Sequence, residues 1–229
     1  GKTITALAIA AKLGQKTLVV THTTNLRNQW EKEVKKSFGY TAGRIGSGMF
    51  NIDAPISVGN IQTLYRRMDV LQKEFGTLIL DEMHHVSSPT FTRIIDEMPC
   101  RYKVGLTGTL ERKDGRHVVF RDYFGNNVIK PPKENYLVPK IDILKTEIRF
   151  LDGSYTPWAE RINHLTMDAE YVHGVSATAA RYAALGHKVL VVSDRVHFLK
   201  SCAKLCGDTA VSITGDMDFA ERETTMNMI

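Results

Sequence analysis

The chain has few cysteines and no long apolar run. Three of its 229 residues are cysteine, Cys100, Cys202 and Cys206, and they form neither an even disulfide framework nor paired metal-ligand clusters. This usage predicts a reducing compartment, with zinc as a remote alternative. No apolar run approaches the roughly 20 residues of a membrane-spanning helix, and no basic segment followed by an apolar core marks a signal peptide. We therefore expect a soluble protein in the cytoplasm or another intracellular compartment, with no membrane partner.

Charge and composition allow several classes of partner. The net charge is +5 and the pI is about 9.1, which permits contact with a polyanion without requiring it. A hydrophobic content of 43% is enough for sizeable cores, so one large or two ordinary domains are expected. The first residue is glycine rather than methionine, and we expect the natural start to lie upstream.

Short apolar segments alternate with amphipathic ones, the pattern of a parallel sheet with crossover helices. Consecutive prolines near residue 131 exclude both a helix and a central strand, so we predict two α/β domains, residues 1–132 and 133–229. The predicted strands of the first domain cover residues 17–20, 56–58, 78–80 and 104–106, with helices over 4–13 and 26–38. In the second of these helices Leu26, Trp30 and Val34 form an apolar stripe, which we expect in the core. The predicted strands of the second domain cover residues 141–150, 188–192 and 210–213, with helices over 168–185 and 196–205.

An acidic pair follows the apolar segment 77–80. Asp81 and Glu82 would lie at the carboxyl end of a buried strand, the edge at which α/β sheets bind ligands. Asp81 is the candidate to hold magnesium, and Glu82 is the candidate to polarise the water that attacks a γ-phosphate. A strand-capping surface turn is an equally good interpretation of this pair taken alone.

The amino terminus favours the nucleotide interpretation. Gly1, Lys2 and Thr3 match the end of a phosphate-binding loop, in which backbone amides cradle phosphates, the lysine reaches the β and γ oxygens, and the hydroxyl meets magnesium. Helix-forming residues follow and stop at Gly14, which places the phosphates at a helix N-terminus. ATP and Mg²⁺ are therefore the expected cofactors, with Lys2, Asp81 and Glu82 as catalytic residues and Thr3 and Asp81 as magnesium ligands.

With these motifs in order, the chain resembles the superfamily 2 helicase core of the DExH kind, within the XPB, RecG and UvsW group. The resemblance covers nearly the whole chain and implies two RecA-like P-loop ATPase domains, both incomplete, with parallel sheets flanked by helices. The matching segments, in the order of motifs I, Ia, Ib, II, III and IV and the segment after it, are residues 1–3, 23–30, 58–64, 81–84, 105–110, 193–195 and 214–222.

The sequence departs from the family pattern at four places. His22 replaces a proline of motif Ia, Asn60 a threonine of motif Ib, and Gly108 an alanine of motif III. Residues 112–114 read Arg-Lys-Asp where XPB-like proteins carry Arg-Glu-Asp. The motifs that supply the arginine finger and the motif VI glutamine are absent, so we expect the fragment to lack a full catalytic site.

The resemblance implies that ATP binds between two domains and closes them, and that hydrolysis reopens them, so that the pair of domains steps along a nucleic-acid strand. His84, Thr107 and Thr109 are the candidates to relay nucleotide state, although the threonines could simply cap strand ends. The resemblance also implies salt-sensitive contacts to nucleic-acid phosphates with little sequence preference. The candidate contacts are Thr23, Arg27, Asn60, Gln62, Arg66, Arg112 and Gly215; for Arg27 and Arg66 a solvated role is equally plausible.

The sequence thus favours an ATP-dependent DNA helicase or translocase. The alternatives are the motor part of a restriction enzyme, an ATP-gated module that remodels a nucleoprotein without separating strands, and a P-loop enzyme acting on a small molecule, which is the least favoured. The sequence distinguishes neither DNA from RNA nor unwinding from annealing.

Overall fold

The computed structural model describes residues 1–85, 89–108, 118–130, 138–148 and 155–228. The chain divides into two compact units, Gly1–Tyr136 and Leu137–Ile229. The domain boundary expected between residues 132 and 133 lies outside the described residues and stays a prediction.

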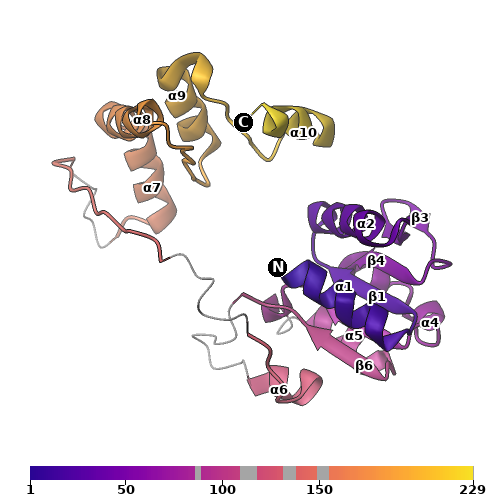
Figure 1. Cartoon of the computed structure of the whole chain (residues 1–229). Coiled ribbons are helices and arrows are strands. Elements are labelled where there is room, and N and C mark those ends of the chain that lie inside the picture. Colours follow the sequence, from indigo (N-terminus) through magenta and orange to yellow (C-terminus); the bar gives the residue numbers. More distant parts are fainter. Residues whose placement is uncertain (86–88, 109–117, 131–137, 149–154, 229) are drawn as a thin grey trace. The chain divides into compact units, whose positions relative to one another are not determined.

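The first unit is built around a six-stranded sheet (Figure 1). Its strand order is β3-β2-β4-β1-β5-β6, parallel throughout except for the antiparallel pair β2 and β3. The strands are β1 (Thr17–Thr21), β2 (Gly43–Gly46), β3 (Met49–Phe50), β4 (Ile56–Asn60), β5 (Thr77–Leu80) and β6 (Tyr102–Gly105). The predicted α/β class and the four predicted strands of this unit are confirmed.

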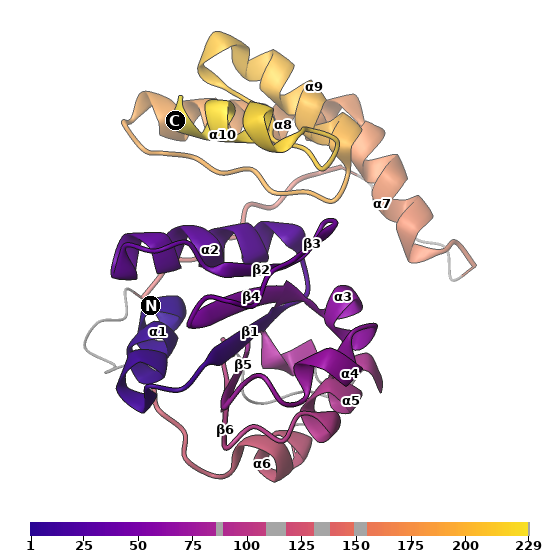
Figure 2. The same cartoon turned by 90° about the vertical axis from the view of Figure 1, so that its right-hand side faces the viewer.

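Helices cover both faces of this sheet (Figure 2). On one side lie α1 (Lys2–Leu13) and α2 (Thr24–Phe38), and on the other α3 (Ile61–Tyr65), α4 (Met68–Leu71) and α5 (Pro89–Glu97), with α6 (Val118–Phe124) against β6. In β1, Val19 points to the α1 and α2 side, whereas Leu18 and Val20 point to the other. Because side chains alternate along a strand, a central strand covered on both faces must be apolar throughout.

The two long helices of this unit end where the sequence predicts. Gly14 and Gly39 follow α1 and α2 in the left-handed conformation, with φ of 62° and 77°, and glycine adopts this conformation without a steric penalty. At its start, α2 is capped by Thr23, whose hydroxyl accepts a hydrogen bond from the Leu26 amide at 3.3 Å. The carboxyl ends of these helices therefore lie near the amino edge of the sheet, and their starts near its carboxyl edge.

In the described part of the second unit, all regular secondary structure is helical. It contains α7 (Trp158–Met167), α8 (Ala169–Ala184), α9 (Val196–Cys206) and α10 (Phe219–Asn227), with a short 3-10 turn, η3 (Gly207–Thr209). Asp168 caps α8 and Asp218 forms a capping box with Glu221 at the start of α10. Val172, Phe198 and Cys202 form a small core between α8 and α9, while Cys206 is only half buried.

The strands predicted for the second unit are wrong. Residues 141–148, 188–192 and 210–213 are extended without strand pairing, and Leu190 and Val192 are 85% and 80% exposed. An extended segment becomes a strand only when its amides and carbonyls pair with a neighbour, and these segments find none among the described residues. Across the described ranges, no helix has the length and apolarity needed to cross a membrane.

Candidate nucleotide site and nucleic-acid edge

The polar motifs lie at the carboxyl edge of the sheet. Strands β1, β4, β5 and β6 run parallel and end at Thr21, Asn60, Leu80 and Gly105, so the residues that follow them meet at one edge. The amide of Met83 donates to the Leu106 carbonyl at 2.8 Å, which ties the segment after β5 to the segment after β6.

Lys2 and Glu82 form an ion pair at this edge. The Lys2 Nζ lies 2.8 Å from Glu82 Oε1, and the side chains are 41% and 27% exposed. Lys2 opens α1, and the preceding N-cap residue, Gly1, provides no side-chain hydrogen bond, so the amides of the first turn remain the natural partners of an anion. Thr3 lies in the same turn, half buried. The structure thus brings the phosphate-loop lysine and the second carboxylate of motif II into contact.

Asp81 is buried and held by two donors. It is 6% exposed; its Oδ2 accepts from the indole Nε1 of Trp30 at 2.8 Å and its Oδ1 from the Glu82 amide at 3.0 Å. Sequence reasoning placed Trp30 in the core stripe of α2 and missed this contact. The available signal was the indole N–H, which needs a partner when tryptophan is buried.

His84 connects the two motifs that the sequence singled out for coupling. Its Nδ1 lies 3.3 Å from the Thr107 hydroxyl and 3.3 Å from Glu82 Oε2. A continuous set of contacts therefore runs from Lys2 through Glu82 and His84 to Thr107. Thr109 and Arg112 lie outside the described residues, and their predicted roles stay predictions.

The backbone around this set of contacts is constrained. Glu82 has a φ of +50°, a left-handed conformation that non-glycine residues seldom adopt and that clusters at functional sites. Gly105 faces the same turn, because a Cβ there would lie 2.2 Å from Met83 Sδ and 3.3 Å from the Phe124 ring. The end of β6 therefore admits the motif II turn only because residue 105 has no side chain.

The proposed phosphate contacts differ in exposure, since some are exposed and two, Arg27 and Asn60, are buried. Thr23, Gln62 and Arg66 are exposed, at the start of α2, in α3 and just after α3, where a polymer backbone could reach them. Gly215 is exposed as well, in the second unit. These positions agree with a surface role, and the contacts themselves stay predictions.

Arg27 differs from both interpretations given to it. It is 2% exposed, so it is neither solvated nor presented to a phosphate. Its Nη1 donates to Asn60 Oδ1 at 2.8 Å and to Ser47 Oγ at 3.2 Å, and its Nε lies 3.4 Å from Glu31 Oε1. Burial lowers the pKa of Arg27, an effect that Glu31 opposes. Arg27 therefore links α2 to β4 inside the unit. Asn60 is only 8% exposed, and its side-chain oxygen accepts the hydrogen bond from Arg27.

The donor set at Lys2, Thr3 and Asp81 fits magnesium nucleotide. Magnesium prefers oxygen ligands and is usually held by one or two carboxylates together with substrate phosphates and water. Each Asp81 oxygen accepts one protein hydrogen bond and keeps a lone pair for a metal or its water. No cluster of three or more His, Cys, Asp or Glu side chains is found in the described ranges, so an all-protein cage is not offered there.

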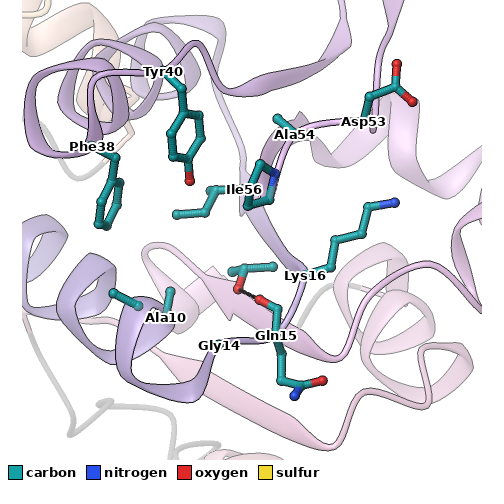
Figure 3. Close-up of a pocket in the computed structure, with 12 residues that line it drawn as sticks. Ala10, Gly14, Gln15, Lys16, Phe38, Tyr40, Asp53, Ala54 and Ile56 are labelled. Atoms are coloured by element: carbon teal, nitrogen blue, oxygen red, sulfur yellow. Dashed lines mark hydrogen bonds between the residues drawn. The ribbon is translucent and has the colours of Figure 1, made fainter.

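A separate hollow lies at the opposite edge of the sheet (Figure 3). It has a volume of about 530 Å³ and is lined by the ends of α1 and α2 and the starts of β1 and β4. Phe38 and Tyr40 stack at 5.8 Å on one side of it, opposite Ala10 and Gly14. Because the motif residues follow the carboxyl ends of the strands, this hollow is distinct from the candidate nucleotide site.

Comparisons of the sequence with known proteins give a matching family and several relatives. Residues 1–112 match the family described as "Type III restriction enzyme, res subunit". The chain is 45% identical to "Probable helicase D10" of Escherichia phage T5 over 201 residues, 88% of this chain and 45% of that protein. It is 34% identical to "DNA 3'-5' translocase XPB2" of Sulfurisphaera tokodaii over 120 residues, 52% of this chain and 27% of that protein. The chain thus spans less than half of the length of both relatives.

A solved structure gives the fold. The helicase domain of Pyrococcus furiosus Hef superposes with a TM-score of 0.52 at 16% identity, covering 90% of this chain and 47% of that one. At this identity the likeness shows a shared fold and nothing finer.

Proposed function

Because residues 1–112 match the family described as "Type III restriction enzyme, res subunit" and relatives of the chain are described as a helicase and a translocase, we propose that the chain is the motor part of an ATP-dependent DNA helicase or translocase. The observation that carries the proposal is the contact of Lys2 with Glu82 beside the buried carboxylate of Asp81. A phosphate-loop lysine, a metal carboxylate and a water-orienting carboxylate at one sheet edge are the parts that phosphoryl transfer to water requires.

Each of these residues has a distinct task in the proposed reaction. Lys2 would leave Glu82 and neutralise phosphate charge. Thr3 and Asp81 would hold the magnesium ion, which would supply charge stabilisation at the phosphates. Glu82, released from Lys2, orients the attacking water. The same carboxylate touches His84, and His84 touches Thr107. A change at Glu82 therefore reaches the segment after β6 through direct contacts.

DNA is the proposed track. Two observations support it: the relative from Sulfurisphaera tokodaii is described as a DNA translocase, and the chain has a net charge of +5. Thr23, Gln62, Arg66 and Gly215 are the proposed contacts to the polymer backbone, together with Arg112. Backbone contacts of this kind give salt-sensitive binding with little sequence preference.

The motor of a restriction enzyme is a second candidate, favoured by the description of the matching family. The two candidates share the ATPase and differ in the work done on DNA. Displacement of a short oligonucleotide from a duplex would support a helicase. Displacement of a protein roadblock from duplex DNA without strand separation would support a translocating motor.

The test is ATP hydrolysis by the full-length protein with single-stranded DNA, duplex DNA, branched DNA or RNA added. We expect stimulation by DNA, and a loss of roughly 100-fold or more in the Glu82→Gln variant, which keeps the shape of the side chain and removes the charge. Binding of a non-hydrolysable ATP analogue by this variant serves as the control for folding. Turnover that no polymer changes would contradict the proposal and favour a small-molecule enzyme.

A further inference from the structure

The only polar group of the Trp30 side chain, its indole N–H, donates a hydrogen bond to the Asp81 carboxylate. The side chain is 1% exposed and lies on α2 among Val19, Val58 and Ile79. The indole has a single donor and no acceptor, and that donor meets Asp81 Oδ2 at 2.8 Å. Packing alone would be satisfied by phenylalanine, so the indole N–H adds a polar contact that the core does not need.

The two hydrogen bonds to Asp81 come from different elements. Glu82, the next residue, donates to Oδ1 through its amide, and Trp30 reaches Oδ2 from a helix 51 positions earlier in the sequence. One donor alone leaves a carboxylate free to rotate about its Cβ–Cγ bond, whereas two donors on its two oxygens fix the carboxylate plane. Asp81 therefore presents its remaining lone pairs in a direction that α2 sets.

We infer that Trp30 is a positioning residue that orients Asp81 toward the magnesium ion, and that α2 thereby ties this carboxylate to the nucleic-acid edge. This edge comprises Asn60 at the end of β4 and the proposed DNA contacts Gln62 and Arg66 that follow it. The inference rests on the proposed function for the identity of the ligand. Partners that orient a metal-binding side chain typically change metal affinity by about 10- to 100-fold when removed.

The link to the nucleic-acid edge is Arg27, one turn before Trp30 on the same buried face of α2. Residues three apart on a helix lie side by side, and the Arg27 guanidinium holds Asn60 at the end of β4 and Ser47 in the turn after β2. The space around this contact is tight, because a Cβ at Gly46 would lie 2.6 Å from Arg27 Nη1. A nucleic-acid strand that displaces Asn60 would move α2, and with it the Trp30 indole N–H that donates to Asp81.

The inference is tested on the full-length protein with two Trp30 variants. Trp30→Phe removes the donor and some volume. Replacement of Trp30 by 3-benzothienylalanine exchanges only the N–H for sulfur, so the packing is retained. For each protein, binding of a fluorescent non-hydrolysable ATP analogue is measured against Mg²⁺ concentration and again with EDTA. Trp158→Phe is the matched control, since Trp158 is 69% exposed in the second unit.

Both Trp30 variants are expected to need about tenfold more Mg²⁺ for half-maximal analogue binding, with binding in EDTA unchanged and the control like the unsubstituted protein. Unchanged Mg²⁺ dependence in the benzothienylalanine variant would overturn the inference alone. If the Trp30 variants lost analogue binding as strongly in EDTA as in Mg²⁺, the inference would also be overturned, because the defect would then not depend on the metal. If the unsubstituted protein shows no Mg²⁺-dependent binding, the proposed function fails and this inference with it.

A spectroscopic measurement tests independently whether Trp30 lies beside the metal. The indole N–H resonance that disappears in Trp30→Phe identifies Trp30 in a ¹⁵N spectrum. With the ATP analogue bound, Mn²⁺ is expected to broaden this resonance at substoichiometric concentration, while the resonance lost in Trp158→Phe stays sharp. Equal broadening of both would contradict the placement of Trp30 beside the metal.

Discussion

The contact of Thr107 with His84 allows a test that separates coupling from hydrolysis. Its hydroxyl lies 3.3 Å from His84 Nδ1, whereas Lys2 and Glu82 meet each other without it. We expect Thr107→Ala to keep basal ATP hydrolysis and to reduce DNA stimulation by roughly 2- to 30-fold, the range of coupling energies carried by single residues between sites.

Steady-state ATPase rates with and without DNA check this prediction. Thr107→Ser retains the hydroxyl and should behave like the unsubstituted protein. A parallel drop in basal and stimulated rates in Thr107→Ala would show instead that the residue acts in hydrolysis.

Cys100 offers a test of burial at a single thiol. Burial raises the pKa of Cys100 from 9.0 to about 11, and its Sγ donates to the Phe75 carbonyl at 3.3 Å. Because the thiolate is the reactive form, the folded protein should resist alkylation at Cys100 from pH 7 through pH 9. Above pH 9 an unfolded thiol ionises before the folded one, so this group destabilises the fold as pH rises toward 11. Peptide mapping after iodoacetamide treatment, with a denatured sample as control, measures the protection.

Sequence reasoning at this scale singled out Lys2, Asp81, Glu82 and His84 because they belong to short motifs with fixed spacing, and the structure brings these residues together. It missed the roles of Trp30 and Arg27, although it placed Trp30 correctly in the core. A helical period predicts which face is buried but not which atom, 51 or 33 positions away, a buried polar group meets. Such pairs depend on the order of strands in the sheet, which no local pattern contains.

At the scale of elements, α2 is fixed to the sheet by charge as well as by packing. Arg27→Ala would leave Asn60 Oδ1 without its donor and weaken the network with Glu31, which keeps its ion pair with Arg44. We expect a loss of about 1–3 kcal/mol in the free energy of unfolding, the usual cost of a buried polar group left without a partner.

Urea denaturation followed by circular dichroism measures this loss. Lys35→Ala, on the exposed face of the same helix, is the control and should change stability by less than about 0.5 kcal/mol. Equal effects of both substitutions would mean that Arg27 contributes only helix propensity.

The two units show what element prediction from sequence depends on. Strands β1, β4, β5 and β6 were predicted from apolar runs, and each one pairs with a parallel neighbour in the structure. The runs at residues 188–192 and 210–213 are similarly apolar but form no strand in the described part of the chain. The helices α8 and α9 form in both prediction and structure, because their hydrogen bonds are internal. An apolar run therefore predicts a strand only where a partner strand exists.

At the scale of the whole molecule, the resemblance to superfamily 2 helicases is confirmed by the match over residues 1–112 and by the relatives described as helicases. The proposed DNA contacts add a prediction about salt. Each phosphate contact contributes about 0.7–0.9 to the slope of log affinity against log salt concentration, so Arg66→Ala in the full-length protein should lower the slope by about that amount.

Fluorescence anisotropy with a labelled oligonucleotide over a range of salt concentrations gives this slope. Arg101→Ala is a matched control, because Arg101 is exposed just before β6, at the amino edge of the sheet. A slope that Arg66→Ala leaves unchanged would remove Arg66 from the proposed contact surface without touching the proposed ATPase.

The left-handed backbone conformation of Glu82 lowers the stability of the fold, whereas the carboxylate of Glu82 is required for the proposed ATP hydrolysis. Glycine would adopt a φ of +50° with less strain than glutamate, yet only an acidic side chain at this position provides the carboxylate that meets Lys2. A laboratory evolution experiment that rewards thermal survival and ignores turnover would therefore admit substitutions of Glu82 by glycine or asparagine. Populations kept under demand for ATP hydrolysis would retain the glutamate and its conformational cost.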